Sequence, residues 1–148
     1  MFEWDLVVDI LQRLLVAVAL GGLVGIERQI HGRWTGLRTH MAVAMGAAVF
    51  AVAALAIAPP PSGQATRVIQ GIAAGIGFLG AGTILKLGDQ LEVKGLTTAS
   101  SIWLAAALGT AAGLKLYALA VAATIVTLIV LAVLRPLEKW FDKRAGKK

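Results

Sequence analysis

The sequence predicts an all-α protein: a polytopic bundle of about five transmembrane helices, with its N-terminus outside and its C-terminus in the cytoplasm. Three observations lead to this fold class. Hydrophobic residues make up 58% of the 148 residues, above the roughly 45–50% of soluble domains, and the mean hydropathy is +0.81. The apolar residues fall into runs of about 20, the length that crosses a bilayer. The basic residues lie mostly in alternate loops and in the tail.

Five apolar runs follow one another along the chain, and each is expected to form one membrane span. They are Leu6–Ile26, Met41–Ala58, Val68–Leu85, Leu96–Leu114 and Leu116–Leu134. The start carries Glu3 and Asp5 where a signal peptide would be basic, so we expect an uncleaved first span. Prolines at 59–61 end the second run in a loop. Only residues 113–116 join the last two runs, and we expect a tight hairpin there, because one helix over 96–134 would be about 58 Å long.

The orientation follows from the basic residues, since cytoplasmic loops are enriched in lysine and arginine. The first loop, the third loop and the tail hold eleven of them: Arg28, Arg33, Arg38, Lys86, Lys94, Arg135, Lys139, Lys143, Arg144, Lys147 and Lys148. The other side holds Arg67 and Lys115 together with the acidic start. This asymmetry places the C-terminus in the cytoplasm, and an odd number of spans then places the N-terminus outside.

The length leaves room for one transmembrane domain, residues 1–134, and a basic cytoplasmic tail, residues 135–148. We expect the tail to rest on the anionic headgroups of the lipid bilayer rather than on nucleic acid. The chain has no cysteine, which excludes disulfides, thiolate metal sites and cysteine nucleophiles. It also lacks a histidine–glutamate zinc motif, a phosphate loop and a serine elbow. We therefore expect no enzyme and no catalytic residue.

Two charged residues fall inside the first run. Asp9 and Arg13 are one helical turn apart and can pair with each other. An ionisable group near the middle of a bilayer costs about 2.5–3.5 kcal/mol on insertion scales and by default indicates function. The sequence leaves two interpretations open, namely a self-satisfied intramembrane ion pair and a functional site.

The third run is the most unusual, because five glycines interrupt an otherwise apolar segment. A glycine costs about 1 kcal/mol relative to alanine inside a helix, so we expect a neighbouring helix or a ligand to approach this backbone closely. Glycines four residues apart let helices pack tightly. Three pairs provide candidate helix-packing faces: Gly21 with Gly25, Gly71 with Gly75, and Gly109 with Gly113.

Polar residues gather at the cytoplasmic ends of the first four runs, where they could converge on one site. The candidate ligand-binding residues are Glu27, Arg28, Arg38, Thr39, Gly80, Gly82, Thr97 and Thr98. A salt bridge from Glu27 to Arg38 or His40, holding a helix hairpin together, is the alternative to a ligand site. Magnesium prefers carboxylate oxygens and water, and Glu27 is the only carboxylate in this set, so the charges favour an anionic or phosphate-bearing ligand over bare Mg²⁺.

Four motifs in order carry a resemblance to a known family: Gly25–Arg28, Gly36–Met41, Gly75–Ile84 and Val93–Ala99. Together they resemble the membrane domain of the MgtC/SapB family. The resemblance implies a multi-pass protein of the bacterial inner membrane, linked to growth under magnesium limitation and to virulence inside host phagocytes. Better-known members continue into a soluble cytoplasmic domain, whereas this sequence ends about 14 residues past the fifth run, so we expect the membrane domain alone.

Two functions remain in view. The first, which the resemblance favours, is a regulator that packs against another membrane complex, such as ATP synthase, or against itself as a homo-oligomer, with a dimer favoured. The alternative is a small ion channel or transporter, formed at a symmetric dimer interface, with a polar site in the cytoplasmic half of the bundle.

Overall fold

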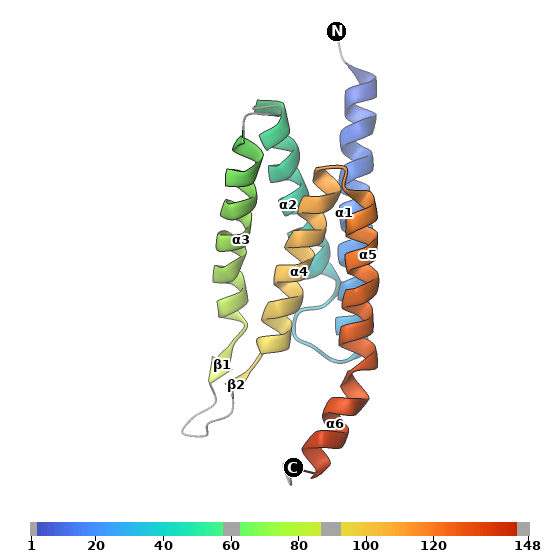
Figure 1. Cartoon of the computed structure of the whole chain (residues 1–148), viewed down its shortest axis with the longest axis vertical. Helices are drawn as coiled ribbons and strands as arrows, with labels where there is room; N and C mark the ends of the chain where they lie inside the picture. Colours follow the sequence, from blue (N-terminus) through green and yellow to red (C-terminus); the bar gives the residue numbers. More distant parts are fainter. Residues whose placement is uncertain (1–2, 58–62, 87–92, 145–148) are drawn as a thin grey trace.

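The computed structural model describes residues 3–57, 63–86 and 93–144. Long helices run side by side along the long axis of the molecule (Figure 1). They are α1 (Trp4–Ile30), α2 (Leu37–Ile57), α3 (Gln64–Gly82), α4 (Leu96–Gly113) and α5 (Tyr117–Leu128), and α5 continues through a π-helical segment, η1 (Ile129–Val133), to α6 (Arg135–Arg144). The predicted all-α class is confirmed. Two short strands between α3 and α4, β1 (Leu85–Lys86) and β2 (Val93–Lys94), pair antiparallel.

Three stretches of the described chain are long and apolar enough to cross a membrane: α1, α2 and the segment Tyr117–Leu137. The helices α3 and α4 are nearly as long, but α3 contains five glycines and the first turns of α4 contain four hydroxyl residues. The number of spans therefore stays a prediction, as does the identity of the cytoplasmic side. Figure 1 shows the N-terminus at one end of the molecule, with the β1–β2 strands and α6 at the other.

Several element boundaries differ from the sequence prediction: α1 extends to Ile30, and α3 begins at Gln64. The helix α2 begins at Leu37, four residues before the apolar run, because polar residues also form its first turn. The helix α3 ends at Gly82, and Leu85 lies in β1 and not in a span. The predicted hairpin after Gly113 is confirmed: α5 begins at Tyr117, and Lys115 turns the chain with a positive φ of 62°. The proline cluster at 59–61 lies outside the described residues.

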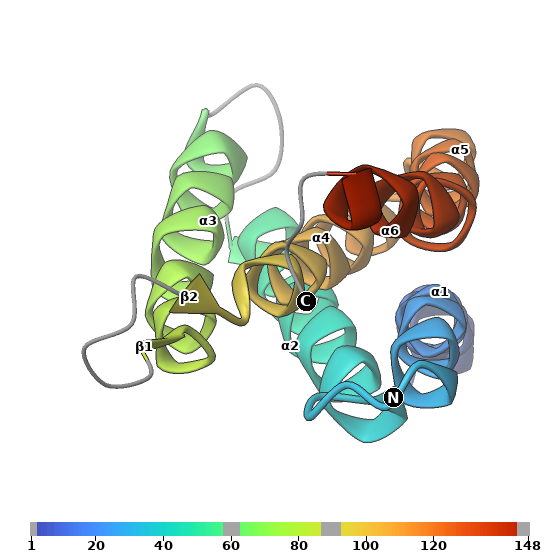
Figure 2. The same cartoon turned by 90° about the horizontal axis from the view of Figure 1, so that it is seen from below.

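Small residues pack α1, α2 and α4 tightly against one another, and Figure 2 shows these helices from one end of the molecule. A Cβ on Gly109 of α4 would lie only 1.9 Å from the carbonyl oxygen of Ala44 in α2. A Cβ on Gly21 of α1 would lie 2.6 Å from the carbonyl oxygen of His40. Gly25 and Gly113 also face the α2 backbone at such distances. Two of the three candidate glycine faces therefore pack inside this bundle, both against α2.

The helix α3 stands apart, on the side of α2 and α4 away from α1 (Figure 2). Its Gly71, Gly75, Gly77 and Gly82 have no atom within 4 Å of the place where a Cβ would be. Only Gly80 meets a neighbour, because a Cβ there would lie 3.6 Å from the Cβ of Ala99 in α4. The expected close approach to the glycines of α3 is thus nearly absent within the described chain, and the Gly71/Gly75 face is open.

Candidate functional site

A pocket of about 260 Å³ lies at the end of the molecule where α1 finishes. It brings together Glu27, Arg28 and Thr97, three of the residues that the sequence singled out. Three further polar residues line it, namely His31, Arg33 and Arg135, and its apolar wall is formed by Val130, Leu131 and Leu134. The pocket therefore joins the end of α1, the start of α4 and the junction between η1 and α6.

The local sequence at the end of α1 explains how this helix places its residues in the pocket. Glu27 and Arg28 are adjacent in the last turn of α1, and His31 follows one turn after Glu27. The helix stops there because Gly32 adopts a positive φ of 64°, a conformation that glycine reaches without steric cost. Arg33 follows in the loop. On the opposite side, the wall belongs partly to a π-helical segment, a rare geometry that is frequent at functional sites.

The charged groups of the pocket are deeply buried and poorly paired. The side chains of Arg28 and Glu27 are 3% and 8% exposed, and Arg28 Nη1 lies 3.6 Å from Glu27 Oε2. His31 Nδ1 lies 2.8 Å from Glu27 Oε1 and donates to the Glu27 carbonyl oxygen at 2.8 Å. Among the described residues, Arg28 Nε, Arg28 Nη2 and both carboxylate oxygens of Glu27 have no hydrogen-bond partner. Buried polar groups normally form hydrogen bonds. These four atoms therefore have hydrogen-bonding capacity that a ligand could use.

The alternative bridge across the α1–α2 hairpin is wrong. Arg38 and Thr39 are exposed on the first turn of α2, and the ion pairs of Glu27 within the described residues reach Arg28 and His31 instead. His40 is fully buried and turns toward α4: its Nδ1 donates to the Gly36 carbonyl oxygen at 2.9 Å, and its Nε2 lies 3.0 Å from Ser101 Oγ. His40 therefore ties α2 to α4.

The remaining predicted ligand residues lie elsewhere. Thr98 is buried, and its carbonyl oxygen lies 2.8 Å from Ser101 Oγ. Gly80 packs against Ala99 of α4, whereas Gly82 is exposed. The structure thus brings Glu27, Arg28 and Thr97 together and leaves Arg38, Thr39, Gly80, Gly82 and Thr98 out of the pocket lining.

Sequence reasoning missed His31, Arg33 and Arg135 as parts of this pocket. A signal for His31 was present, since a histidine four residues after a glutamate lies on the same helix face. Arg135 could not be found in this way, because its place depends on α5 returning beside α1. The sequence had placed it at the start of a basic tail.

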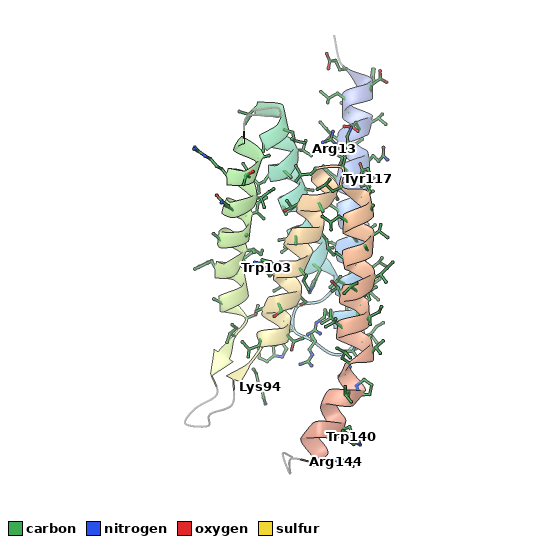
Figure 3. The ribbon with its side chains drawn as sticks, viewed as in Figure 1. Arg13, Lys94, Trp103, Tyr117, Trp140 and Arg144 are labelled. Atoms are coloured by element: carbon green, nitrogen blue, oxygen red, sulfur yellow. The ribbon has the colours of Figure 1, made fainter. Side chains whose placement is uncertain are left out.

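The two charges inside the first run form a network at the opposite end of the bundle. Arg13 Nη2 pairs with Asp9, and Lys115 Nζ lies 2.7 Å from the other Asp9 oxygen. Arg13 Nη1 also donates to the carbonyl oxygen of Gly113 at 3.0 Å. Figure 3 shows Arg13 beside the turn that precedes Tyr117. Asp9 and Arg13 therefore connect α1 to the α4–α5 turn.

A larger hollow separates α2 from α3. It measures about 740 Å³ and its lining is apolar, from Ala42, Val43, Gly46, Ala47, Phe50, Val68, Gly71, Ile72, Gly75, Ile76, Leu79 and Ala106. The open Gly71/Gly75 face of α3 and Gly46 of α2 border it. We call this hollow the α2–α3 groove. Elsewhere, Trp103 lines a smaller apolar hollow between α3 and α4 (Figure 3).

Metal ligands are sparse in the described residues. No group of three or more histidine, cysteine, aspartate or glutamate side chains there could hold a metal ion. The polar pocket offers one carboxylate beside three guanidinium groups.

Comparison with known proteins identifies the family. A model of the MgtC family matches residues 14–140. Protein MgtC of Brucella abortus is 44% identical over 132 residues, which cover 89% of this chain and 54% of that protein. Protein SrpB of Synechococcus elongatus is 41% identical over 86% of this chain and 75% of its own length, and an uncharacterized protein of Synechocystis is 42% identical over 95% and 57%. The chain thus spans between about half and three quarters of these relatives, and no solved structure matches it. A match over most of its length shows that the chain belongs to the MgtC family.

Proposed function

We propose that this chain is a regulatory protein of the bacterial inner membrane, which acts by packing against another membrane protein and not by conducting ions. Its membership of the MgtC family supports a role of the MgtC type. The observation that carries the proposal is the contrast between the tight α1–α2–α4 bundle and the open α2–α3 groove. The link to magnesium limitation and virulence rests on the family resemblance.

Tight packing argues against a conduit inside a single chain. Not even a methyl group fits between Gly109 and Ala44, where α4 crosses α2, or between Gly21 and His40, where α1 crosses α2. A hydrated ion is much larger than a methyl group. The buried polar groups between α2 and α4, His40 and Ser101, bond to each other.

The α2–α3 groove suits a transmembrane helix as occupant. Helices associate in membranes where small residues let their backbones approach, and three glycines border this groove with free space around Gly46, Gly71 and Gly75. Its lining is apolar throughout, so a partner helix would bury no unpaired charge there. We propose that the partner helix comes from another membrane complex, and the membrane sector of ATP synthase is the first complex to look for. A second copy of this chain is the competing occupant.

Site-specific crosslinking tests the proposal, because the chain has no cysteine of its own. Ile72→Cys places a thiol in the groove, and Phe78→Cys places one on an 84% exposed position of the same helix that does not line the groove. In native membranes, a thiol crosslinker should join the Ile72→Cys variant to a different membrane protein, and the Phe78→Cys variant should give less of this product. If the Ile72→Cys product is only a dimer of this chain, or does not exceed the control, the proposed partner is wrong.

A matched pair of glycine variants adds a functional test. Gly75→Leu fills the groove, whereas Gly77→Leu adds the same side chain to the same helix outside it, and both positions have free space within the chain. Only Gly75→Leu should reduce the crosslink from position 72. The transport alternative is tested with the purified chain in liposomes and ion-sensitive dyes. We expect no flux above that of empty vesicles. A flux of cations or anions would contradict the regulator proposal and support the transporter alternative.

A further inference from the structure

The polar pocket at the end of α1 is not needed for packing in the α2–α3 groove, and its chemistry indicates a ligand. Its guanidinium groups come from three separate segments: Arg28 from α1, Arg33 from the loop after α1, and Arg135 from the start of α6. With His31 neutral, three guanidinium groups and the one carboxylate of Glu27 leave a formal charge of +2. A concentration of positive charge in a pocket attracts an anion.

Arg28 supplies the strongest evidence for where an anion would bind. The residue is 2% exposed, yet its Nε and Nη2 have no hydrogen-bond partner among the described residues. These two nitrogens lie on the same edge of the planar guanidinium, so both free N–H groups point to one side. A guanidinium edge matches two oxygens of a phosphate or a carboxylate. The third nitrogen, Nη1, is turned toward Glu27.

Glu27 fits the same ligand. Its carboxylate offsets part of the charge of Arg28, and within the described residues neither oxygen accepts a hydrogen bond, although Oε1 lies 2.8 Å from His31 Nδ1. A hydrogen phosphate carries an O–H group, and many phospholipid headgroups carry a hydroxyl. Either could donate to Glu27 while its phosphate oxygens accept from Arg28. The volume of the pocket is about 260 Å³, just below the roughly 300–1,000 Å³ of sites for drug-sized molecules. The pocket therefore has room for a phosphate or a phospholipid headgroup.

The wall opposite Arg28 is apolar. Val130 and Leu134 are 50% and 49% exposed, on the surface that α5 and η1 present to their surroundings. A phosphate attached to acyl chains could therefore bind in the pocket while the chains follow this surface. Free phosphate would use the same guanidinium groups without touching the apolar wall.

We propose that the pocket binds a phosphate group, through Arg28 at its base and Arg33 and Arg135 at its rim. The group belongs to a phospholipid headgroup or to phosphate free in solution, and the two sources are distinguished by experiment. This inference is independent of the proposed regulatory function, because none of these residues lines the α2–α3 groove.

The test uses the full chain, purified in a maltoside detergent that contains no phosphate. Its unfolding midpoint is measured against added inorganic phosphate, against phosphatidylglycerol, and against a galactolipid with the same acyl chains but no phosphate. Three variants are compared with the unmodified chain. Arg28→Gln and Arg135→Gln each remove one guanidinium from the pocket, and Arg67→Gln removes the same charge from an exposed position on α3.

We expect inorganic phosphate or phosphatidylglycerol to raise the midpoint of the unmodified chain and of Arg67→Gln, and the galactolipid to leave it unchanged. Arg28→Gln should weaken the apparent affinity by roughly tenfold to hundredfold, as expected for losing a charged hydrogen bond. A response to inorganic phosphate identifies free phosphate as the ligand, and a response to phosphatidylglycerol alone identifies the headgroup.

The inference would be overturned by the absence of a response to either phosphate source, or by an equal response in the pocket variants and in Arg67→Gln. If Arg28→Gln does not fold, as circular dichroism would show, Arg135→Gln decides alone, because Arg135 is only partly buried at the rim. An equal response to the galactolipid would also refute phosphate recognition, since it would assign binding to the acyl chains.

Discussion

Replacing Gly109 by alanine should destabilise the bundle by about 2 kcal/mol. The new methyl carbon would lie 1.9 Å from the carbonyl oxygen of Ala44, whereas ordinary contact begins at 3.4 Å, so α2 and α4 must separate by about 1.5 Å, the difference between these distances. Overpacking of this kind costs about 1–3 kcal/mol, and we take the upper value because the obstacle is backbone. The higher helix propensity of alanine offsets this overpacking cost by about 1 kcal/mol.

Gly77→Ala is the matched control, because Gly77 is also helical but has no atom within 4 Å of a new Cβ. It should stabilise the protein by up to about 1 kcal/mol through helix propensity alone. The assay is reversible unfolding in mixed maltoside and dodecyl sulfate micelles, followed by tryptophan fluorescence. If Gly109→Ala is as stable as Gly77→Ala, then α4 does not cross α2 at Gly109, and the tight bundle would be refuted.

Three further predictions concern other parts of the molecule, each measured by the same unfolding assay. Asp9→Asn should lower the unfolding midpoint at low salt and lower it less at high salt, because it removes the carboxylate that pairs with both Arg13 and Lys115. Ser101→Ala should lower the free energy of unfolding by about 1–3 kcal/mol, because it removes the hydroxyl 3.0 Å from Nε2 of the buried His40. Gly95→Ala should cost about 1–3 kcal/mol or more, because residue 95 has a φ of +98° and a Cβ there would lie 1.9 Å from a backbone oxygen.

Each of these variants has a control of the same chemistry. Asp5→Asn removes an exposed carboxylate from the first turn of α1. Ser100→Ala removes an exposed hydroxyl that donates to the Leu96 carbonyl oxygen of its own helix. Gly82→Ala adds a methyl group where no atom of the described residues lies within 4 Å. A control that loses as much stability as its partner would contradict the contact in question.

The long helices and the α4–α5 hairpin could be predicted because they depend on local sequence. Apolar runs of bilayer length specify helices, and the short connection of residues 113–116 between two such runs predicts the hairpin. The pairing of Asp9 with Arg13 is also local, since residues four apart share a helix face. Each of these features is fixed within about one turn or one span of the chain.

Features that depend on which helices meet could not be predicted. The pattern of Gly21 and Gly25 is the same as that of Gly71 and Gly75, yet the first pair packs against α2 and the second stays open. Nothing local distinguishes the two pairs. The interaction of His40 with Ser101 requires the α2–α4 crossing, which several small residues fix together. The polar pocket was predicted only in part for the same reason.

The turn at Lys115 has a consequence for the far end of the molecule. A left-handed backbone costs a residue with a side chain about 1–2 kcal/mol, and here the side chain is held by Asp9 of α1. The turn therefore fixes the rotation of α5 about its own axis. Leu131 and Leu134 lie some 16 to 19 residues further on, roughly 25 Å at helical rise, and line one wall of the polar pocket at the end of α1. One residue inserted into this turn would rotate that wall by about 100° and leave Arg28 where it is.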